Sequence, residues 1–459
     1  MFSHQAGLDL LRQMRAHTQE LEEFRMDDSW YKVFRLSARE QRPEDLLGVC
    51  QFTWAPPLIN YSDRRKSIFE EIAGQGSWLQ FQEEGTLNTN IFSWLVNNTE
   101  IRPMILEEFA CYRYHLRCKN GRPNRGWGCN MFHSVIQQVI RQDPLYYMLS
   151  AAARPDANYR LISYPYYVAD KRAGDRHVDL SPALYIHSAG TQGGFSSTKS
   201  PYPTAAGMGR GGLTIQGGVA IDNETPEGGC TKVVKGFHKR IRTWWTAVEE
   251  RLAKKGLRPP TGLVTNLDSN VWTKDDEERY GSFIQVPMEA GQARITMAEV
   301  IHGSTRTTAA HRRVVFPWYT GIKDDHKTLD QVEAGTWEEV ASAHRDFVPG
   351  PCSGPSGYPH IYGSSTPFGG CVSVRGVAPI CDALLGVRKY TDLAVLGDVA
   401  CLLGEDRIAA MRRVDEIRKV LLESYHHWYS QSVKMEQLAY GSNSYYYING
   451  SNALGIQAN

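Results

Sequence analysis

The chain has 459 residues, of which 42% are hydrophobic, and a formal net charge of +1. This length allows a well-buried core, either in one domain of about 300 residues with added helices or in two domains. The near-neutral charge argues against a nucleic-acid-binding protein, which usually carries a basic excess, and favours a small-molecule substrate. No run of about 18 apolar residues without charges is present, so the sequence predicts no membrane span.

Three regions follow one another along the chain. Residues 1–150 are expected to form a helical region that packs on the core, because apolar residues recur at helical spacing, most clearly from Phe132 to Ile140. Residues 151–320 change to short runs rich in Tyr, Ile and Val between Gly, Pro and Asp-Asn turns, which is typical of an all-β sandwich or barrel. Residues 321–459 are expected to form a loop or lid followed by a helical C-terminal region.

The β region contains both expected strands and an expected helix. Strands are predicted at 283–287, 294–301 and 312–319. Residues 238–255 form a charged helical insertion, and its basic end is better explained as a solvated helix face than as a phosphate contact.

The nine cysteines are scattered, and no Cys-x-x-Cys pair occurs among them. An odd number without paired spacing predicts neither a disulfide framework nor a zinc ribbon. Scattered thiols fit a reducing compartment, and the N-terminal segment lacks the apolar core of a secretion signal. The sequence therefore predicts a cytoplasmic protein, and it leaves the oligomeric state open.

His177 and Asp179 stand two residues apart where a predicted strand ends. Two histidines and one carboxylate are the usual ligands of non-haem iron, and such a pair can bend toward one ion as its strand enters a loop. In a chain with 14 histidines, about 0.7 His-x-Asp triplets are expected by chance. A second triplet, from His344 to Asp346, does occur. It lies in a predicted helix, where positions two apart face different directions, so we interpret it as a decoy.

His302 is the candidate for the third ligand. A predicted strand runs up to Ile301, His302 follows at its end, and a polar turn leads to a strand that begins with Arg312 and Arg313. An arginine at this position suits a dicarboxylate cosubstrate, because a guanidinium group binds a carboxylate through two parallel hydrogen bonds. A single histidine is more often a satisfied polar residue than a ligand, but the ordered combination favours a metal site.

These motifs resemble the phytanoyl-CoA hydroxylase-like branch of the iron(II)/2-oxoglutarate dioxygenases. The likeness covers about 158–320 and rests on the His-x-Asp pair, on IQGGVAIDNETPEGGCTKVVKGFHK at 215–239 and on PMEAGQARITMAEVIHGS at 287–304. In the last stretch Gly291 precedes His302 by eleven residues. Gly229, Lys235 and Phe237 depart from the family pattern, but they lie in a hairpin outside the predicted site.

The resemblance implies a mainly β core with helices (α+β). Its form would be a double-stranded β-helix, a cupin-like jelly roll, with helical N- and C-terminal extensions. The interval between Asp179 and His302 is longer than usual in the family, which implies insertions at about 187–212 and 240–282. His238 matches a turn histidine of the family and is interpreted as structural.

The resemblance also implies the chemistry. His177, Asp179 and His302 would hold Fe(II) as the catalytic centre, with 2-oxoglutarate as cosubstrate, O2 as oxidant and ascorbate as a supporting reductant. The reaction would oxidise an unactivated C–H bond by hydroxylation, desaturation or ring closure, and would release succinate and CO2. The chain as a whole is similar to fungal oxygenases of specialised metabolism, some of which act on free amino acids.

Either arginine suits the cosubstrate. Arg313 lies eleven residues after His302, a common distance in the family, whereas Arg312 shares strand parity with Val314 and Phe316. Val314 and Phe316 are candidates for substrate contact, with ordinary core packing as an equal alternative. The remaining candidates for cosubstrate contact are Tyr164, Thr214 and Gln216.

Two other functions stay open at this point. The chain could be an oxygenase that acts on a nucleic-acid base or a protein side chain, although its near-neutral charge counts against a nucleic-acid partner. It could also be a non-catalytic jelly-roll protein whose ligands hold structural zinc or bind a small molecule. The sequence does not identify the substrate or the stereochemistry of the reaction.

Overall fold

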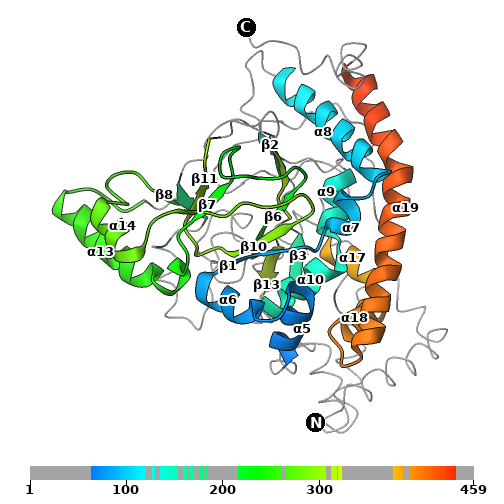
Figure 1. The fold of residues 1–459 in the computed structure, drawn as a ribbon, viewed down its shortest axis with the longest axis horizontal. Helices are drawn as coiled ribbons and strands as arrows, with labels where there is room; N and C mark the ends of the chain where they lie inside the picture. Colours follow the sequence, from blue (N-terminus) through cyan, green and yellow to red (C-terminus); the bar gives the residue numbers. More distant parts are fainter. Residues whose placement is uncertain are drawn as a thin grey trace, which may run out of the picture.

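The structure is a computed structural model, and it places helices on two sides of a set of antiparallel strands (Figure 1). The residues that it describes are 64–118, 127–129, 135–153, 159–162, 166–169, 176–179, 182, 215–260, 265–306, 312–317, 319–322, 376–385, 388, 390 and 392–440.

The larger of two sheets has eight strands, and its described pairings are all antiparallel. Six strands follow in the order β1 (Thr86–Thr89), β10 (Ala293–Met297), β6 (Ile215–Ala220), β12 (Arg313–Val315), β4 (Tyr166–Ala169) and β2 (Trp127–Cys129). Beside them, β13 (Tyr319–Ile322) pairs with β3 (Tyr159–Ile162) and with β6.

The smaller sheet has five short strands, which are also antiparallel. Their order is β8 (Thr265–Asn266), β5 (His177–Val178), β11 (His302–Ser304), β7 (Thr231–Val233) and β9 (Ile284–Gln285).

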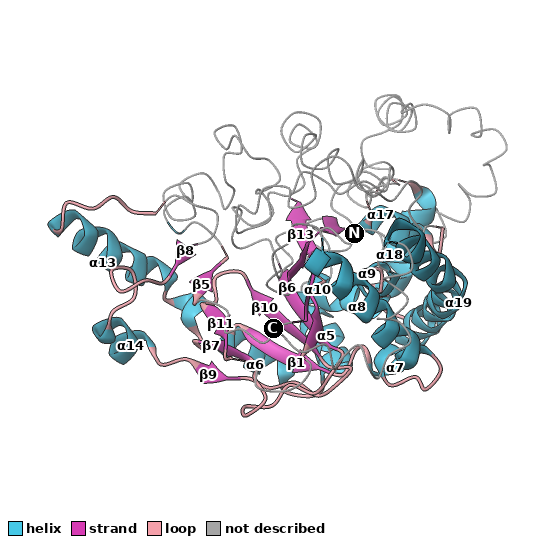
Figure 2. Ribbon diagram, turned by 90° about the horizontal axis from the view of Figure 1, so that it is seen from above, coloured by secondary structure: helices cyan, strands magenta, loops and turns pink. Residues whose placement is uncertain are grey.

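Helices lie on both sides of the strands (Figure 2). A 3-10 turn (η5, Phe237–Lys239), α13 (Ile241–Lys254) and α14 (Lys274–Tyr280) lie beside the smaller sheet. Helix α6 (Ser77–Glu84) lies below the strands in Figure 1, and its residues Gln82 and Glu83 contact η5. The remaining described helices gather toward the other side: α5 (Arg65–Ala73), α7 (Ser93–Val96), α8 (Ile101–Cys118), α9 (Val135–Arg141), α10 (Pro144–Ala153), α17 (Pro379–Leu384), α18 (Leu393–Leu402) and α19 (Arg407–Tyr440).

Strand β6 separates two environments. Ile215 and Val219 belong to the main apolar core, which the helices share. At Gly217, between them, an added Cβ would lie 2.2 Å from the hydroxyl of Tyr146, so only glycine lets α10 come this close. Because side chains alternate along a strand, Gln216 and Ala220 point to the opposite face. That second face carries the candidate site.

The expected helical insertion packs against the smaller sheet. Helix α13 lies within the predicted 238–255, and it buries Trp244 and Trp245 completely. The Trp244 ring lies 5.2 Å from that of Phe237 and 6.1 Å from that of Trp272, in tilted or edge-on arrangements that aromatic rings favour. The charged positions of α13 therefore lie on the outside of an aromatic cluster.

The chain leaves the larger sheet earlier than the sequence predicts. The sequence predicts one strand over 294–301 with His302 at its end, and this prediction is wrong: β10 ends at Met297, a turn follows, and His302 opens β11 in the smaller sheet. Val300 and Ile301 are fully buried although they are not in a strand. Apolar turn residues that carry the chain between two sheets look like a strand continuation in a one-dimensional pattern.

The strand predicted at 312–319 is also divided. In the structure β12 ends at Val315 and β13 begins at Tyr319, with Pro317 between them. Proline has no N–H to donate to a strand partner, which explains the break.

The predicted mixture of helices with an antiparallel β core is confirmed. Closure into a jelly roll and the three proposed regions stay predictions. Within the first region, β1 and β2 join the larger sheet, so these residues contribute strands as well as helices. The insertion expected at 187–212 lies outside the described residues.

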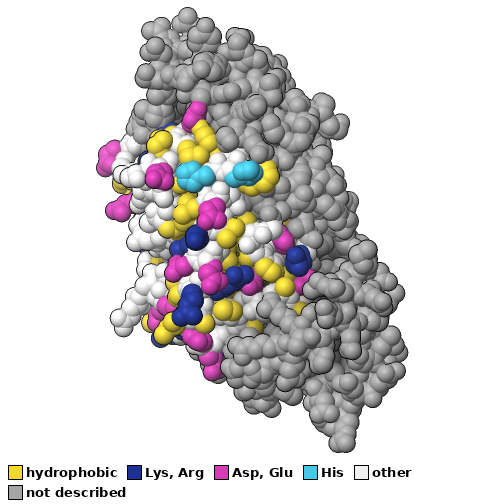
Figure 3. All heavy atoms as spheres, turned by 90° about the vertical axis from the view of Figure 1, so that its right-hand side faces the viewer, with side chains coloured by type: hydrophobic (Ala, Val, Ile, Leu, Met, Phe, Trp, Pro, Cys, Tyr) yellow, Lys and Arg dark blue, Asp and Glu magenta, His cyan; other side chains and the backbone are white. Residues whose placement is uncertain are grey.

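The face beside α19 carries acidic and basic side chains interspersed with apolar ones over its described part (Figure 3). Arg413 illustrates the pattern, since it pairs with both Asp398 and Glu416. None of the described helices combines the length and apolar character that a membrane crossing requires.

Candidate active site

Two adjacent strands of the smaller sheet bring the predicted histidines together. His302 on β11 stands directly opposite His177 on β5. Directly opposed residues project to the same face, and the two imidazole rings lie 4.4 Å apart between centroids. Asp179 follows β5 immediately and is 2% exposed. The long interval between the two histidines is therefore closed by strand pairing.

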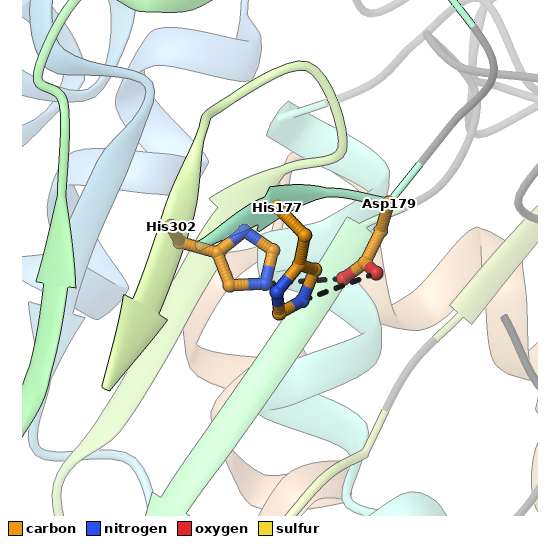
Figure 4. Close-up of side chains that lie close together, drawn as sticks. All are labelled: His177, Asp179 and His302. Carbon is orange, nitrogen blue, oxygen red and sulfur yellow. Dashed lines mark ion pairs between the residues drawn. The ribbon is translucent and has the colours of Figure 1, made fainter. Parts of the chain in front are cut away.

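The Asp179 carboxylate lies to one side of the two imidazole rings and contacts both of them (Figure 4). Its Oδ1 is 3.4 Å from Nε2 of His177, and its Oδ2 is 3.1 Å from Nε2 of His302. One ligand atom from each of the three residues lies within 4.8 Å of the others, the arrangement that a shared metal ion needs. The other predicted triplet, at His344, lies outside the described residues.

Two further contacts orient these side chains. Gln216 on β6 donates from Nε2 to Oδ2 of Asp179 at 2.5 Å. Nδ1 of His302 lies 3.0 Å from the carbonyl oxygen of Val300, which accepts a hydrogen bond when that nitrogen carries the proton. This tautomer leaves Nε2 of His302 as the acceptor. A metal-binding histidine usually donates its other ring N–H to a carbonyl or carboxylate oxygen in this way. Gln216, expected to contact cosubstrate or substrate, thus lies directly against the Asp179 carboxylate, and its contact with either molecule stays a prediction.

The pKa values of Asp179 and His302 move in opposite directions. Burial acts to raise the pKa of Asp179, but His177, His302 and the Gln216 hydrogen bond outweigh it, so this pKa is lowered. Burial acts to lower the pKa of His302, but the Asp179 carboxylate and the Val300 carbonyl outweigh it, so that pKa is raised. Without a metal, the site therefore holds an ionised carboxylate beside a histidine that protonates readily.

The two candidate arginines have different partners. Arg312 is 7% exposed, and its Nε donates to Oε1 of buried Glu224 at 2.7 Å. Arg313 donates from Nε and from Nη2 to the two carboxylate oxygens of Asp222, at 2.6 Å each. Arg102 of α8 lies 3.7 Å from the same Asp222. Arg313 is thus held toward the helices, and Arg312 is turned to the other face.

Val314 and Phe316, the predicted apolar contacts, lie on the same face of the larger sheet as Gln216. An added Cβ at Gly218 would lie 3.5 Å from Val314 and 3.7 Å from Phe316. Both pack in a small cluster with Ala220. Tyr164 and Thr214 lie outside the described residues.

Arg294 and Glu224 are two further candidate residues, for which the sequence predicts no role. Both are almost fully buried, at 5% and 3% exposure. The alternation of residues along β10 indicates where Arg294 points. Ala293, Ile295 and Met297 belong to the main core, so Arg294 at the alternating position faces the other side of the sheet. A charged residue on the enclosed face of a buried strand is a candidate functional residue.

Comparison with known proteins identifies the class. Residues 190–315 match the family model for phytanoyl-CoA dioxygenase (PhyH). The match covers a minority of the chain; it includes His302 and both arginines, and it begins after Asp179. No curated protein matches the chain.

Three solved structures show weak similarity. EctD from S. alaskensis with 2-oxoglutarate and 5-hydroxyectoine is 13% identical over 55% of this chain and 77% of its own, with a TM-score of 0.37. The non-heme alpha ketoglutarate dependent carbocyclase SnoK from nogalamycin biosynthesis is 13% identical over 55% and 88%, with a TM-score of 0.36. The epimerase SnoN, in complex with Fe3+, alpha ketoglutarate and nogalamycin RO, is 14% identical over 53% and 81%, with a TM-score of 0.33. At such scores the family match alone supports the class.

The chain is an oxidoreductase of the dioxygenase class. More particularly, its matched region is of the phytanoyl-CoA dioxygenase type, so the branch predicted from the sequence is confirmed.

Proposed function

We propose that the protein is an oxygenase that holds iron(II) with His177, Asp179 and His302 and uses 2-oxoglutarate to oxidise an unactivated C–H bond of a small molecule. The observation that carries this proposal is the convergence of the three ligand atoms within 4.8 Å. Two imidazoles and one carboxylate leave open positions on a six-coordinate iron for cosubstrate and oxygen. The family match supports the same chemistry.

The donor set fits iron on chemical grounds. Both Nε2 atoms approach the Asp179 carboxylate, and a bound cation would take the place of these direct contacts. The Gln216 and Val300 contacts already orient one carboxylate and one imidazole, so the ligands need little reorganisation. When bound, iron(II) would activate O2 with electrons from 2-oxoglutarate, which leaves as succinate and CO2.

Arg312 is the proposed partner for the far carboxylate of 2-oxoglutarate, in preference to Arg313. Both arginines are paired with a carboxylate, so the preference rests on the face: Arg313 binds Asp222 on the side that faces α8. Arg312 directly precedes β12 and shares the strand parity of Val314, and its Nη2 is 3.4 Å from Oγ1 of Thr231 in the smaller sheet. It thus reaches between the two sheets, where the metal ligands also lie.

The proposed substrate is a small molecule, with hydroxylation, desaturation or ring closure as the outcome. Val314 and Phe316 would give it an apolar contact and keep water from the reacting carbon. Oxidation of a nucleic-acid base is the weaker alternative, because the chain has a formal net charge of only +1.

The test follows 2-oxoglutarate decarboxylation and succinate formation by purified protein with iron(II) and ascorbate, alone and with candidate small molecules. Turnover should appear and should fall at least a hundredfold in His177→Ala and Asp179→Ala. His344→Ala is the matched control, because it removes the histidine of the other His-x-Asp triplet and should leave turnover intact. Absence of succinate together with tightly bound zinc would establish the non-catalytic alternative, and equal loss in His344→Ala would overturn the ligand assignment.

A further inference from the structure

Arg294, Glu224 and Arg312 form a buried cluster with one surplus positive charge. Nη2 of Arg312 lies 2.6 Å from Oε1 of Glu224, and Nη2 of Arg294 lies 3.5 Å from Oε2 of the same carboxylate. Among the described residues, Glu224 is the only carboxylate that is paired with either arginine. Arginine stays protonated even when buried, so two cations share one anion.

The larger sheet places this cluster close to the metal ligands. Arg294 on β10 stands opposite Gly218, and Thr296, two residues further, stands opposite Gln216. Gln216 in turn donates to Asp179. Two residues along a strand correspond to about 7 Å, and residues two apart share a face.

The smaller sheet gives the same separation, about two residues, between the arginine cluster and the metal ligands. Thr231, which Arg312 contacts, is two residues from Val233 on β7, and Val233 stands opposite His302. The cluster therefore lies on the same side as the metal ligands and about two residues along the strands from them.

The fold itself gains little from such a cluster. Removing charged groups from water is costly, and replacing a buried Arg–Glu–Arg set with apolar residues is often neutral or stabilising in proteins. Arg294 is nevertheless held firmly, since its Nε donates to Oδ1 of Asn88 at 3.1 Å and its Nη2 donates to the carbonyl oxygen of Val286. A buried surplus charge that is fixed in place suits an anionic ligand.

We propose that Arg294 is a second cosubstrate-binding residue, which supplies the positive charge that the far carboxylate of 2-oxoglutarate needs because Glu224 already neutralises Arg312. This inference rests on the proposed function. With both arginines present, the cluster carries +1 and the incoming carboxylate brings −1, so the enclosed site becomes neutral when the cosubstrate binds. Arg312 alone, paired with Glu224, would leave that carboxylate without a counter-charge.

The test is a calorimetric titration of protein loaded with Mn2+, which avoids turnover. Two probes are compared: 2-oxoglutarate, and 2-oxopentanoate, which has the same chain without the far carboxylate. Arg294→Gln should weaken 2-oxoglutarate binding by about 10- to 100-fold, the usual loss for a hydrogen bond to a charged group, and should leave 2-oxopentanoate binding unchanged. Retained binding of 2-oxopentanoate also demonstrates that the variant is folded.

Two further variants test the charge count. Arg313→Gln is the matched control, because it removes an arginine that is paired with Asp222, and it should bind both probes as the parent does. In Glu224→Gln/Arg294→Gln the surplus charge returns to Arg312, so 2-oxoglutarate affinity should recover relative to Arg294→Gln. No selective loss in Arg294→Gln, or no recovery in the double variant, overturns the inference. A parent protein that binds neither probe would instead refute the proposed function.

Discussion

A proton and a metal ion compete for the same atoms of Asp179 and His302. Nε2 of His302 points at Oδ2 of Asp179 from 3.1 Å, so a proton between them satisfies both groups when no metal is bound. That contact outweighs the opposing effect of burial and raises the pKa of His302 above its ordinary value of 6.5. A metal ion must displace this proton before Nε2 can serve as a ligand.

Metal affinity should therefore rise with pH. Below the raised pKa of His302, which lies above 6.5, each metal ion releases a proton, and affinity should increase up to tenfold per pH unit. The lowered pKa of Asp179 keeps its carboxylate ionised throughout this window, so it adds no slope. Competition titrations of Zn2+ against a chelating dye at several pH values measure the effect. Constant affinity from pH 6 to 8, after correction for the dye, would contradict it.

At the scale of elements, the turn from α6 into β1 connects the helical layer to the site. Gly85 ends α6 with φ +74°, a backbone conformation that glycine adopts without strain. An added Cβ there would lie 2.4 Å from Nδ1 of His238 and 2.6 Å from Cγ2 of Val300. His238 also lies 3.0 Å from the carbonyl oxygen of Gln82 through Nε2, in keeping with its predicted structural role. The carbonyl oxygen of Val300 in turn lies 3.0 Å from Nδ1 of His302, so this turn supports the proposed metal ligand.

Gly85→Ala should lower the free energy of unfolding by about 2–4 kcal/mol, because it combines backbone strain with a steric clash. Gly256→Ala is the matched control: Gly256 has φ +67°, and nothing lies within 4 Å of its added Cβ. It should cost only the backbone part, about 1 kcal/mol. Urea unfolding of both variants measures the difference, and equal losses would show that the contacts around Gly85 relax freely.

At the scale of the whole molecule, α19 is anchored to a segment far away in the sequence. Arg418 donates from Nε to Oδ2 of Asp143 at 2.7 Å and from Nη2 to the carbonyl oxygen of Ile91 at 2.9 Å. Its guanidinium carbon also lies 4.9 Å from the centroid of the Trp94 ring. Asp143 is completely buried, and it accepts a hydrogen bond from the backbone N–H of Tyr146 at the start of α10. One ion pair thus connects the C-terminal helix to the helices behind the larger sheet.

Arg418→Met should destabilise the protein by about 3–5 kcal/mol, because it leaves the Asp143 carboxylate buried without its cation. In Arg418→Met/Asp143→Asn the charge is gone while Oδ1 still accepts from Tyr146, so part of the loss should be recovered. Thermal or urea unfolding of both variants checks this coupling. A double variant that is less stable than Arg418→Met would contradict this, because it would show that the Asp143 charge stabilises the fold without Arg418.

The sequence by itself determined the metal ligands as candidates, the change from helical to β texture, and the branch of the family. These signals are local or ordered along the chain: a His-x-Asp pair, a Gly-led strand before His302, and runs of β-forming residues between turns. Spacing and periodicity of this kind can be read from the sequence alone, because they reflect which face of a single helix or strand is buried.

Tertiary structure decided what depends on pairing between distant strands. The proposed choice of Arg312 over Arg313 rests on the different carboxylates that the two arginines meet, and those carboxylates belong to a different part of the chain. The end of β10 at Met297 follows from the crossing between sheets, which an apolar turn conceals. The proposed role of Arg294 can be inferred only from the pairing of β10 with β6, because the burial and partners of a charged side chain depend on residues that are distant in the sequence.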